Sequence, residues 1–339
     1  MVEKDNILIL DSLAIGYNPG DKNEKILIRG LKLSILKGEM VALVGANGIG
    51  KSTLLRTISG LQRAAMGEII LWGRKLEEYS RNELARKISF VFTGLSGVFN
   101  MSVFELVALG RFPHTNWLGR LTGHDREIIE SSIDSVGLTG HTASNIGELS
   151  DGERQRAMIA RALAQDTELI LLDEPTAFLD LPNRYELVKL LRKLSVEKEK
   201  SVVFSTHDID IAIREADKVW LAAMDTISEG SPEDMALTGR FDILFEGSDL
   251  LFVPDEGIFT YPVKTKMTIR LEGSDIFKYW TERALNRLGI RSRKGAVSPS
   301  ITIVSDKGVN KWVYESSVAK KEFSDIYSLI LYMKEILTE

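Results

Sequence analysis

The stretch GANGIGKST, residues 45–53, decides the fold of this chain. It follows the apolar run MVALV and precedes STLLRTISGL, whose apolar spacing predicts a helix. The stretch matches G-x-x-x-x-G-K-S, in which glycines let successive backbone N–H groups surround a phosphate. Its candidate nucleotide-binding residues are Gly45, Asn47, Gly48, Gly50, Lys51, Ser52 and Thr53.

The side chains of this loop suit a nucleoside triphosphate. Lys51 supplies a mobile cation for the β- and γ-phosphates, and Ser52 offers a hydroxyl to Mg²⁺. The helix that starts near Thr53 points its positive end at the same anion. An ordinary glycine turn before a helix is the alternative, but lysine and serine in register after a strand favour phosphate binding.

A second motif, LILLDE at residues 169–174, is an apolar strand that ends in two carboxylates. Asp173 can hold Mg²⁺ through water, because this cation keeps several waters and takes few carboxylates. Glu174 can polarise the water that attacks the γ-phosphate. Such a run alone often marks only a strand that stops at the surface, but downstream of a phosphate loop it becomes specific.

Composition restricts the class of protein. The 339 residues suggest two domains, and 44% hydrophobic with 27% charged residues is typical of globular chains. A net charge of −5 argues against nucleic acid as a partner, and the lack of cysteine excludes disulfides and fits a reducing compartment. The N-terminal MVEKDN is not an apolar signal, and no apolar run reaches the roughly 20 residues that cross a bilayer. We expect a protein that is not exported and meets a membrane only through a partner.

Strand and helix patterns alternate up to about residue 250, which predicts a mostly parallel sheet covered by helices. The proline- and glycine-containing residues 254–264 are the expected linker to an accessory domain at 265–339. The order βαββα there suggests a ferredoxin-like or related open sandwich. We expect its aromatic residues to lie in the core: Phe277, Tyr279, Trp280 and Trp312.

The segment LSDGERQR, residues 149–156, lies between the two motifs, and with it residues 5 to about 250 resemble the ATPases of ABC transporters. GRFPH at 110–114 and LDLPNR at 179–184 resemble the branch that powers uptake of iron-siderophore, haem or cobalamin complexes. The resemblance implies a P-loop NTPase of the α/β class at residues 1–253, with an antiparallel β subdomain and a helical subdomain at about 94–150.

The same resemblance implies roles for single residues. Ser150 and Gly152 keep the two signature positions that contact the γ-phosphate bound by the opposite subunit, whereas Asp151 and Glu153 depart from the usual LSGGQ. We expect the side chain of Asp151 to point away from the nucleotide, because an acid repels phosphate. Three further positions match family residues, namely the aspartate that communicates across the dimer, the switch histidine and the aromatic that stacks on adenine: Asp180, His207 and Tyr17.

One position departs from the family. A glutamine that binds Mg²⁺ and reports on the permease usually ends the strand corresponding to ISFVF, and Thr93 stands there instead. A threonine hydroxyl can bind Mg²⁺ but has a shorter reach, which a bridging water can span. We therefore expect Thr93 to coordinate the metal indirectly or only in the closed state.

These assignments predict partners. The signature residues must come from a second copy of the chain, so we expect a head-to-tail dimer that binds two ATP molecules. The resemblance adds integral membrane permease subunits, a substrate-binding protein reached through the permease, and a cytoplasmic place at the inner face of the cell membrane. The accessory domain is a candidate for regulation or dimer stabilisation, by analogy with other extended transport ATPases.

Three functions stay open. The chain is an ATPase for import of a metal chelate, an ATPase of another transport complex, or a soluble nucleotide-dependent regulator that acts through its C-terminal domain. GRFPH and LDLPNR favour the first, whereas Thr93 gives the third some support, because loss of transport would leave such a change.

Overall fold

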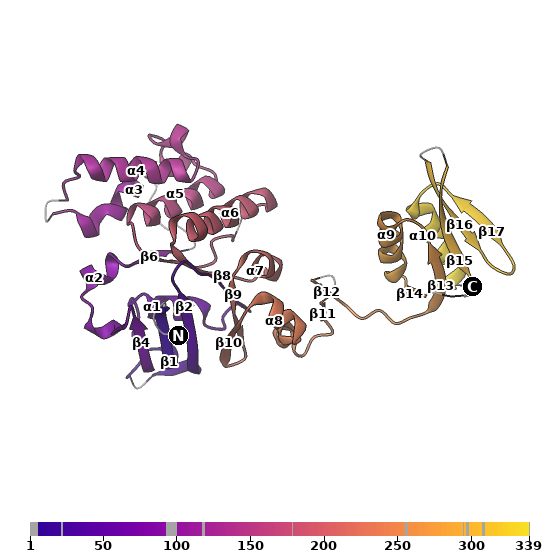
Figure 1. The fold of residues 1–339 in the computed structure, drawn as a ribbon, viewed down its shortest axis with the longest axis horizontal. Coiled ribbons are helices and arrows are strands. Elements are labelled where there is room, and N and C mark those ends of the chain that lie inside the picture. Colours follow the sequence, from indigo (N-terminus) through magenta and orange to yellow (C-terminus); the bar gives the residue numbers. More distant parts are fainter. Residues whose placement is uncertain are drawn as a thin grey trace. The chain divides into compact units, whose positions relative to one another are not determined.

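The chain folds into two compact units (Figure 1), Met1–Ser248 with Phe252–Phe259, and Asp249–Leu251 with Thr260–Glu339. The structure, a computed structural model, describes residues 6–21, 23–92, 100–116, 119–177, 179–254, 257–293, 295, 298–306 and 309–338.

A six-stranded sheet forms the centre of the first unit. Five of its strands are parallel, and the last strand along the chain pairs antiparallel at one edge. In sheet order the strands are β10 (Thr226–Gly230), β9 (Lys218–Ala223), β3 (Met40–Gly45), β8 (Ser201–Thr206), β7 (Leu169–Leu172) and β6 (Ile88–Val91).

Both faces of this sheet are buried, as parallel sheets require. Along β3, Val41 and Leu43 belong to one hydrophobic cluster while Ala42 and Val44 belong to the other, because successive side chains point to opposite faces. These apolar runs form strands rather than helices because they are short, rich in branched residues and bounded by glycine or charge.

A second, antiparallel sheet of four strands shares one hydrophobic cluster with the first sheet. Its strands in sheet order are β2 (Lys25–Leu36), β1 (Asn6–Tyr17), β4 (Met66–Leu71) and β5 (Arg74–Lys75). Helix α1 (Lys51–Ile58) contributes Leu54, Leu55 and Ile58 to this cluster, all fully buried.

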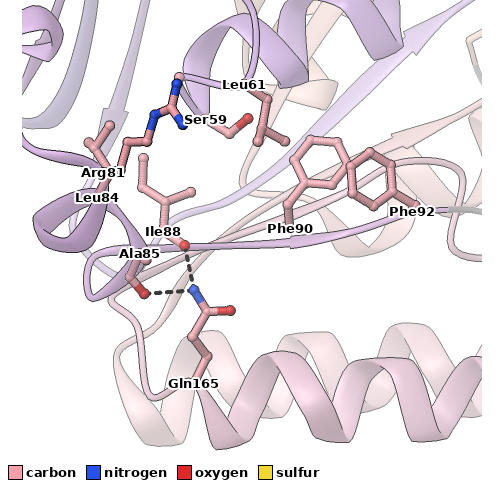
Figure 2. A pocket seen from close by; sticks show the side chains of 10 residues that line it. Ser59, Leu61, Arg81, Leu84, Ala85, Ile88, Phe90, Phe92 and Gln165 are labelled. Atoms are coloured by element: carbon pink, nitrogen blue, oxygen red, sulfur yellow. Dashed lines mark hydrogen bonds between the residues drawn. The ribbon is translucent and has the colours of Figure 1, made fainter. Parts of the chain in front are cut away.

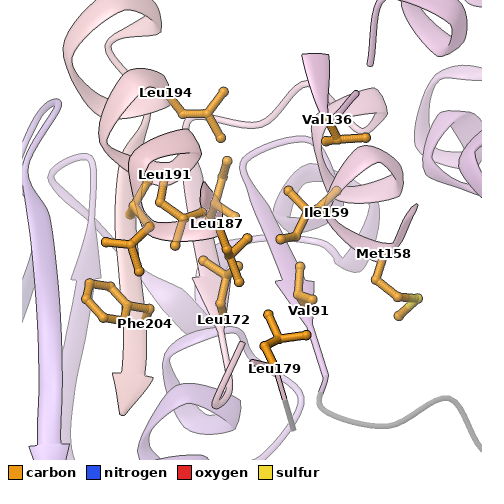
Figure 3. Packing of buried hydrophobic residues seen from close by; sticks show 14 of the residues in the cluster. Val91, Val136, Met158, Ile159, Leu172, Leu179, Leu187, Leu191, Leu194 and Phe204 are labelled. Atoms are coloured by element: carbon orange, nitrogen blue, oxygen red, sulfur yellow. The ribbon is translucent and has the colours of Figure 1, made fainter. Parts of the chain in front are cut away.

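Helices cover the opposite face of the larger sheet (Figure 1). Leucines of α6 (Leu181–Lys198) pack against Leu172 and Phe204 of the central strands (Figure 3). Besides α1, the helices of the first unit are α2 (Arg81–Ala85), α3 (Val103–Ala108), α4 (Gly123–Ser135), α5 (Asp151–Ala164), α6, α7 (Ile209–Glu215) and α8 (Pro232–Leu237). Short 3-10 turns join them: η1 (Leu76–Glu78), η2 (Leu109–His114), η3 (Thr139–His141), η4 (Ile146–Glu148) and η5 (Arg240–Phe245).

The second unit is a five-stranded sheet with helices packed on one of its faces, an open sandwich. A two-stranded sheet, β11 (Leu251–Val253) with β12 (Ile258–Thr260), precedes it. The elements along the chain are β13 (Met267–Glu272), α9 (Asp275–Asn286), β14 (Ile290–Ser292), β15 (Ser300–Asp306), β16 (Val309–Glu315), β17 (Lys320–Phe323) and α10 (Ile326–Thr338).

Two of these strands, β14 and β17, are additional to the expected βαββα order. Each has three or four residues and reads as polar, IRS and KKEF, so neither shows the alternation that predicts a strand. The expected burial of aromatic residues is confirmed for Trp312, which is 5% exposed. It is wrong for Tyr279 and Trp280, which are 40% and 54% exposed because they lie on the outer side of α9.

Candidate nucleotide-binding site

The glycine loop connects the end of β3 to the start of α1 and needs its glycines. Gly48 and Gly50 have φ of 81° and 115°, a region that disfavours any side chain. A Cβ at Gly45 would lie 2.6 Å from the carbonyl oxygen of Ala222 on β9. The loop conformation therefore depends on glycine at all three positions. Asn47 is exposed, Ser52 is half-buried and Thr53 is buried in the first turn of α1.

The ammonium of Lys51 is held by its own loop. Its Nζ donates to the carbonyl oxygens of Gly45 at 2.8 Å and Ala46 at 3.1 Å. It also lies 3.5 Å from Oε1 of Glu174, although the side chain of Lys51 is only 4% exposed. A buried cation of this kind is stabilised only by such partners. The structure thus joins the predicted phosphate-binding lysine to the predicted catalytic carboxylate.

The two carboxylates after β7 are tied to the neighbouring strand by one hydroxyl. Ser205, fully buried on β8, donates to Oδ1 of Asp173 at 2.8 Å and accepts from the backbone N–H of Glu174 at 2.7 Å. Glu174 has φ of 45°, a conformation that is uncommon for a residue with a side chain. Ser205 therefore holds both the metal-ligand candidate and the backbone of the candidate base.

The strand order explains how these residues meet. Val44 of β3 is level with Thr206 of β8, and Phe204 of β8 is level with Leu172 of β7, so three parallel strands end together. Ligands of α/β sheets bind at this carboxyl edge. His207 follows β8 at the same edge and is exposed. Thr93 lies outside the described residues.

Tyr17 ends β1, whose Ile15 lies beside the glycine loop. The Cδ1 atom of Ile15 would be 3.7 Å from a Cβ on Gly50, and Tyr17 is two residues further along the strand. Tyr17 is 48% exposed. An exposed aromatic at this end of the strand is available to a planar ligand.

The signature segment begins α5. The hydroxyl of Ser150 accepts from the backbone N–H of Glu153 and donates to its carboxylate, a capping box. These hydrogen bonds lower the pKa of Glu153 below its ordinary value. Asp151 pairs with Arg154 of its own helix at 3.2 Å. In the described part of the chain, Ser150 and Gly152 form no hydrogen bond or ion pair with the glycine loop.

Instead, the signature segment contacts the start of α6. A Cβ on Gly152 would lie 3.4 Å from the side-chain amide of Asn183. Asn183 donates to Oδ1 of Asp180 at 2.6 Å, and Asp180 caps α6. The structure therefore brings Gly152 near Asp180 within one chain. Among the described residues, neither Gly152 nor Asp180 forms a hydrogen bond or ion pair with Lys51 or Glu174.

The GRFPH segment is structural in this chain. Arg111 on η2 is 5% exposed, and its Nε donates to Asp125 of α4 at 2.9 Å while its Nη1 donates to the carbonyl of Ala164 at 2.8 Å. A Cβ on Gly110 would lie 2.2 Å from the carbonyl oxygen of Arg161. The segment thus fastens η2 to α4 and to the end of α5.

A cavity of about 520 Å³ lies beside the last turn of α5. Its lining includes Leu61, Leu84, Ile88, Phe90, Phe92 and Gln165 (Figure 2). Gln165 donates to the carbonyls of Ala85 at 2.7 Å and Ile88 at 2.9 Å, which joins the end of α5 to the elements around β6. Exposed Leu61 and Phe92 make this cavity, termed here the α5 pocket, open to a partner.

Two of these features could not be recognised from sequence alone. Ser205 is one of three hydroxyl residues in the strand SVVFST, and its only signal is its position two residues before His207. Arg111 carries the signal of a charge inside an apolar helical segment, which favours a buried ion pair as much as a surface charge.

Within the described residues, every helix is too short or too polar to pass through a bilayer. A glycine loop between a parallel strand and a helix, with a lysine that meets a carboxylate from a strand two places away, defines a P-loop ATPase of the α/β class.

Comparison with known proteins gives the family. Residues 28–177 match the ABC transporter family model, and residues 266–334 match that of the iron ABC transporter C-terminal domain. An uncharacterised ABC transporter ATP-binding protein of Methanocaldococcus jannaschii is 40% identical over 80% of this chain and 95% of that relative. The iron(3+)-hydroxamate import ATP-binding protein FhuC of Bacillus subtilis is 38% identical over 62% of this chain and 76% of FhuC.

Comparison with solved structures supports the same family. An inward-facing ABC transporter described as of the metal-chelate type matches with a TM-score of 0.62 and 31% identity, over 71% of this chain and 90% of that one. A dimeric ATP-binding cassette bound to ADP and phosphate matches with a TM-score of 0.58 and 28% identity, over 66% of this chain and 98% of the cassette.

The chain belongs to the ATP-binding proteins of ABC transporters. It binds ATP, and its hydrolysis of ATP is coupled to transport. The predicted P-loop NTPase fold with an added C-terminal domain is confirmed.

Proposed function

We propose that this chain is the ATP-hydrolysing subunit of an importer that takes up a metal chelate (an iron-siderophore, haem or cobalamin complex) through a separate permease. The single observation that carries the ATPase assignment is the 3.5 Å contact between Lys51 and Glu174 at the carboxyl edge of the sheet. The substrate class is supported by the match of residues 266–334 to a domain of iron transporters and by relatives such as FhuC.

In the proposed reaction, Lys51 turns from the carbonyls of its own loop to the β- and γ-phosphates of ATP. Glu174, freed from that ion pair, accepts the proton of the attacking water. Ser205 keeps the backbone of Glu174 in place during this exchange. His207 contacts the γ-phosphate from the same edge, Asp180 communicates with the second subunit, and Tyr17 stacks on the adenine.

Mg²⁺ accompanies ATP in this proposal, and the residues present fit it. Ser52 offers a hydroxyl and Asp173 a carboxylate that is 6% exposed and oriented by Ser205. Oxygen donors are what this cation selects. Bound there, Mg²⁺ neutralises the developing charge of the phosphates. Thr93, outside the described residues, is proposed to coordinate the metal indirectly or only in the closed state.

Two copies of the chain complete the site. Within the part of the chain that the structure describes, Ser150 and Gly152 form no hydrogen bond or ion pair with the glycine loop of their own chain, and we propose that they reach the γ-phosphate held by the partner copy. The dimeric cassette bound to ADP and phosphate supports this arrangement. ATP then provides the contact that closes the dimer, and hydrolysis removes it.

Mixing two inactive variants tests the dimer. Lys51→Ala and Ser150→Arg should each abolish turnover alone, but their mixture should regain about a quarter of the active sites, because half of the random dimers carry one intact site. The regain is measured as phosphate release against mixing ratio. A mixture of Lys51→Ala with Glu174→Gln is the matched control, since both changes lie in the same half-site and no pairing restores one. Equal activity of the two mixtures would contradict the shared site.

The permease is proposed to dock at the α5 pocket. Exposed Leu61 and Phe92 give the pocket an apolar opening, and Gln165 ties its wall to α5, whose other end carries Ser150. Through α5, docking of the permease at one end of the helix would shift the signature segment at the other end. This contact would hold the chain at the inner face of the membrane, with the substrate-binding protein on the far side of the permease.

Leu61→Glu should therefore abolish copurification with a polytopic membrane protein, because a carboxylate would be buried in an apolar contact. Leu237→Glu is the matched control, since Leu237 is 82% exposed and lies outside the pocket. In the wild-type complex, ATP hydrolysis should rise when the substrate-binding protein arrives loaded with a metal chelate. A chain that copurifies only with soluble proteins would instead support the regulator.

The second unit is proposed to act as a separate domain at residues 265–339 after a linker at 254–264, with a regulatory or dimer-stabilising role. A truncation after residue 262 tests this role. If dimerisation, transport and the regulation of transport are all unchanged in the truncated protein, this part of the proposal is wrong.

A further inference from the structure

Helix α9 of the second unit carries large apolar or aromatic residues on both its inner and its outer side. One side packs into the core through Phe277, Thr281, Ala284 and Leu285, and Thr281 accepts a hydrogen bond from Nε1 of Trp312 at 2.7 Å. A helix that covers one face of a sheet normally turns a polar face to water. The outer side of α9 carries charged residues, but it also exposes three large apolar or aromatic side chains, and these need an explanation.

The outer side carries a continuous stripe. Ile276, Tyr279, Trp280 and Arg283 follow each other at helical spacing, and Arg287 extends the row by one turn. The first three side chains are 60%, 40% and 54% exposed. These five residues are termed here the α9 stripe.

The aromatic part of the stripe is organised around one cation. The guanidinium of Arg283 lies 5.6 Å from the ring centre of Tyr279 and 5.7 Å from that of Trp280, and its Nη1 donates to the hydroxyl of Tyr279 at 2.7 Å. The two rings pack edge to face at 5.4 Å. Cation–π contact and this hydrogen bond hold the exposed side chains in one arrangement.

The charge of the region is opposite to that of the whole chain. Residues 260–339 contain 14 lysines and arginines against 9 aspartates and glutamates, a net charge of +5, whereas the whole chain has −5. Such an asymmetry between the parts of a chain indicates an anionic partner for the basic part.

The cations of the stripe are available to such a partner. On the sheet, Arg270, Lys311 and Lys320 each lie within 4 Å of a glutamate. Among the described side chains, by contrast, no carboxylate lies within ion-pair distance of Arg283 or Arg287. Arg283 and Arg287 therefore place part of the domain's unpaired positive charge beside the exposed aromatic residues.

We propose that the α9 stripe binds the anionic headgroup surface of a lipid bilayer. Tryptophan and tyrosine favour the membrane–water interface, arginine pairs with lipid phosphates, and an exposed isoleucine can reach the acyl boundary. The basic charge is distributed over the domain, which suits a diffuse anionic surface better than one acidic protein site. Family membership adds a reason, since the chain serves a membrane transporter.

Vesicle sedimentation of the full-length protein tests the proposal. The protein should bind vesicles of phosphatidylcholine that contain about a third phosphatidylglycerol, bind pure phosphatidylcholine much more weakly, and be released by high salt. The double variant Arg283→Gln/Arg287→Gln should lower the partition coefficient about 25-fold, because each arginine near the surface contributes about fivefold. Trp280→Ser should lower it by about tenfold through lost apolar contact.

The matched control removes two positive charges from the sheet of the second unit instead of from α9. Lys311→Gln/Lys320→Gln should change partition by less than about twofold, because both lysines are paired with glutamates of the sheet, whereas the arginines of the stripe are not. Equal effects of the two double variants, equal binding to neutral vesicles, or capture of an acidic soluble protein while vesicles stay unbound would each overturn the proposal. No stripe residue belongs to the nucleotide-binding site, so the stripe variants should keep normal ATP turnover when vesicles are absent. This measurement checks that the variants fold, and it separates the result from the tests of the ATPase and of permease docking.

Discussion

Glu174→Gln should lower the rate of ATP hydrolysis by about 10²- to 10⁴-fold and leave ATP binding intact. Glutamine has the same size and keeps the backbone bond to Ser205, but its amide cannot accept the proton of the attacking water. It also loses the ion pair with Lys51 at 3.5 Å, which frees the ammonium for the phosphates. Binding is therefore expected to be equal or tighter.

The measurement is single-turnover hydrolysis of ATP, combined with equilibrium binding of a fluorescent ATP analogue. Glu77→Gln on η1 is the matched control, because it makes the same change at an exposed carboxylate outside the site. If Glu174→Gln hydrolysed ATP at the normal rate, another group would have to serve as the base, and the assignment made from the end of β7 would be wrong.

Arg111→Met should lower the free energy of unfolding by about 3–5 kcal/mol, the largest stability effect expected of a single change here. Methionine fills much of the space but leaves the carboxylate of Asp125, 7% exposed, without its cation. It also leaves the carbonyl of Ala164 without the donor that Nη1 supplies. Breaking a buried pair on one side costs more than removing both charges.

The double variant Arg111→Met/Asp125→Asn separates the ion pair from simple packing. It should be more stable than Arg111→Met alone, because no buried charge is left without a partner. Urea unfolding near pH 7 measures both variants. If the double variant were less stable than the single one, loss of packing rather than of charge pairing would explain the effect.

The choice of pH matters for this comparison. The hydroxyl and backbone N–H of Thr122, with Arg111, lower the pKa of Asp125 to about 2 from its ordinary value near 4. A carboxyl whose pKa is lower in the folded state contributes stability that is complete above its unfolded pKa. The contribution of Asp125 is therefore fully present at pH 7 and is lost only as the pH falls from about 4 towards 2.

Much of the site could be predicted because its motifs are local. GANGIGKST specifies a loop between a strand and a helix, since its glycines permit positive φ at Gly48 and Gly50 and its lysine stands at the start of α1. LILLDE specifies a buried strand that ends in acids. Each of these depends on neighbours within about ten residues, where hydrophobic period and turn chemistry are informative.

The second unit shows where local patterns are insufficient. The sequence indicated a separate α+β domain, but β14 and β17 join its sheet only because β13 and β16 offer them backbone hydrogen bonds. For the same reason, the sequence could not show which aromatic residues of α9 would be buried and which would be exposed. Which side of α9 meets the sheet is decided by packing, and it leaves Trp280 in water while it buries Leu285.

By itself, the sequence determined that this protein has a phosphate loop, a strand ending in Asp173 and Glu174, and a second domain. Only the tertiary structure decided that Lys51 meets Glu174, that Ser205 holds both carboxylates, and that Arg111 is buried against Asp125. The physical reason is strand order: β3, β8 and β7 are neighbours in the sheet though far apart in the chain, and no local periodicity encodes which strands pair.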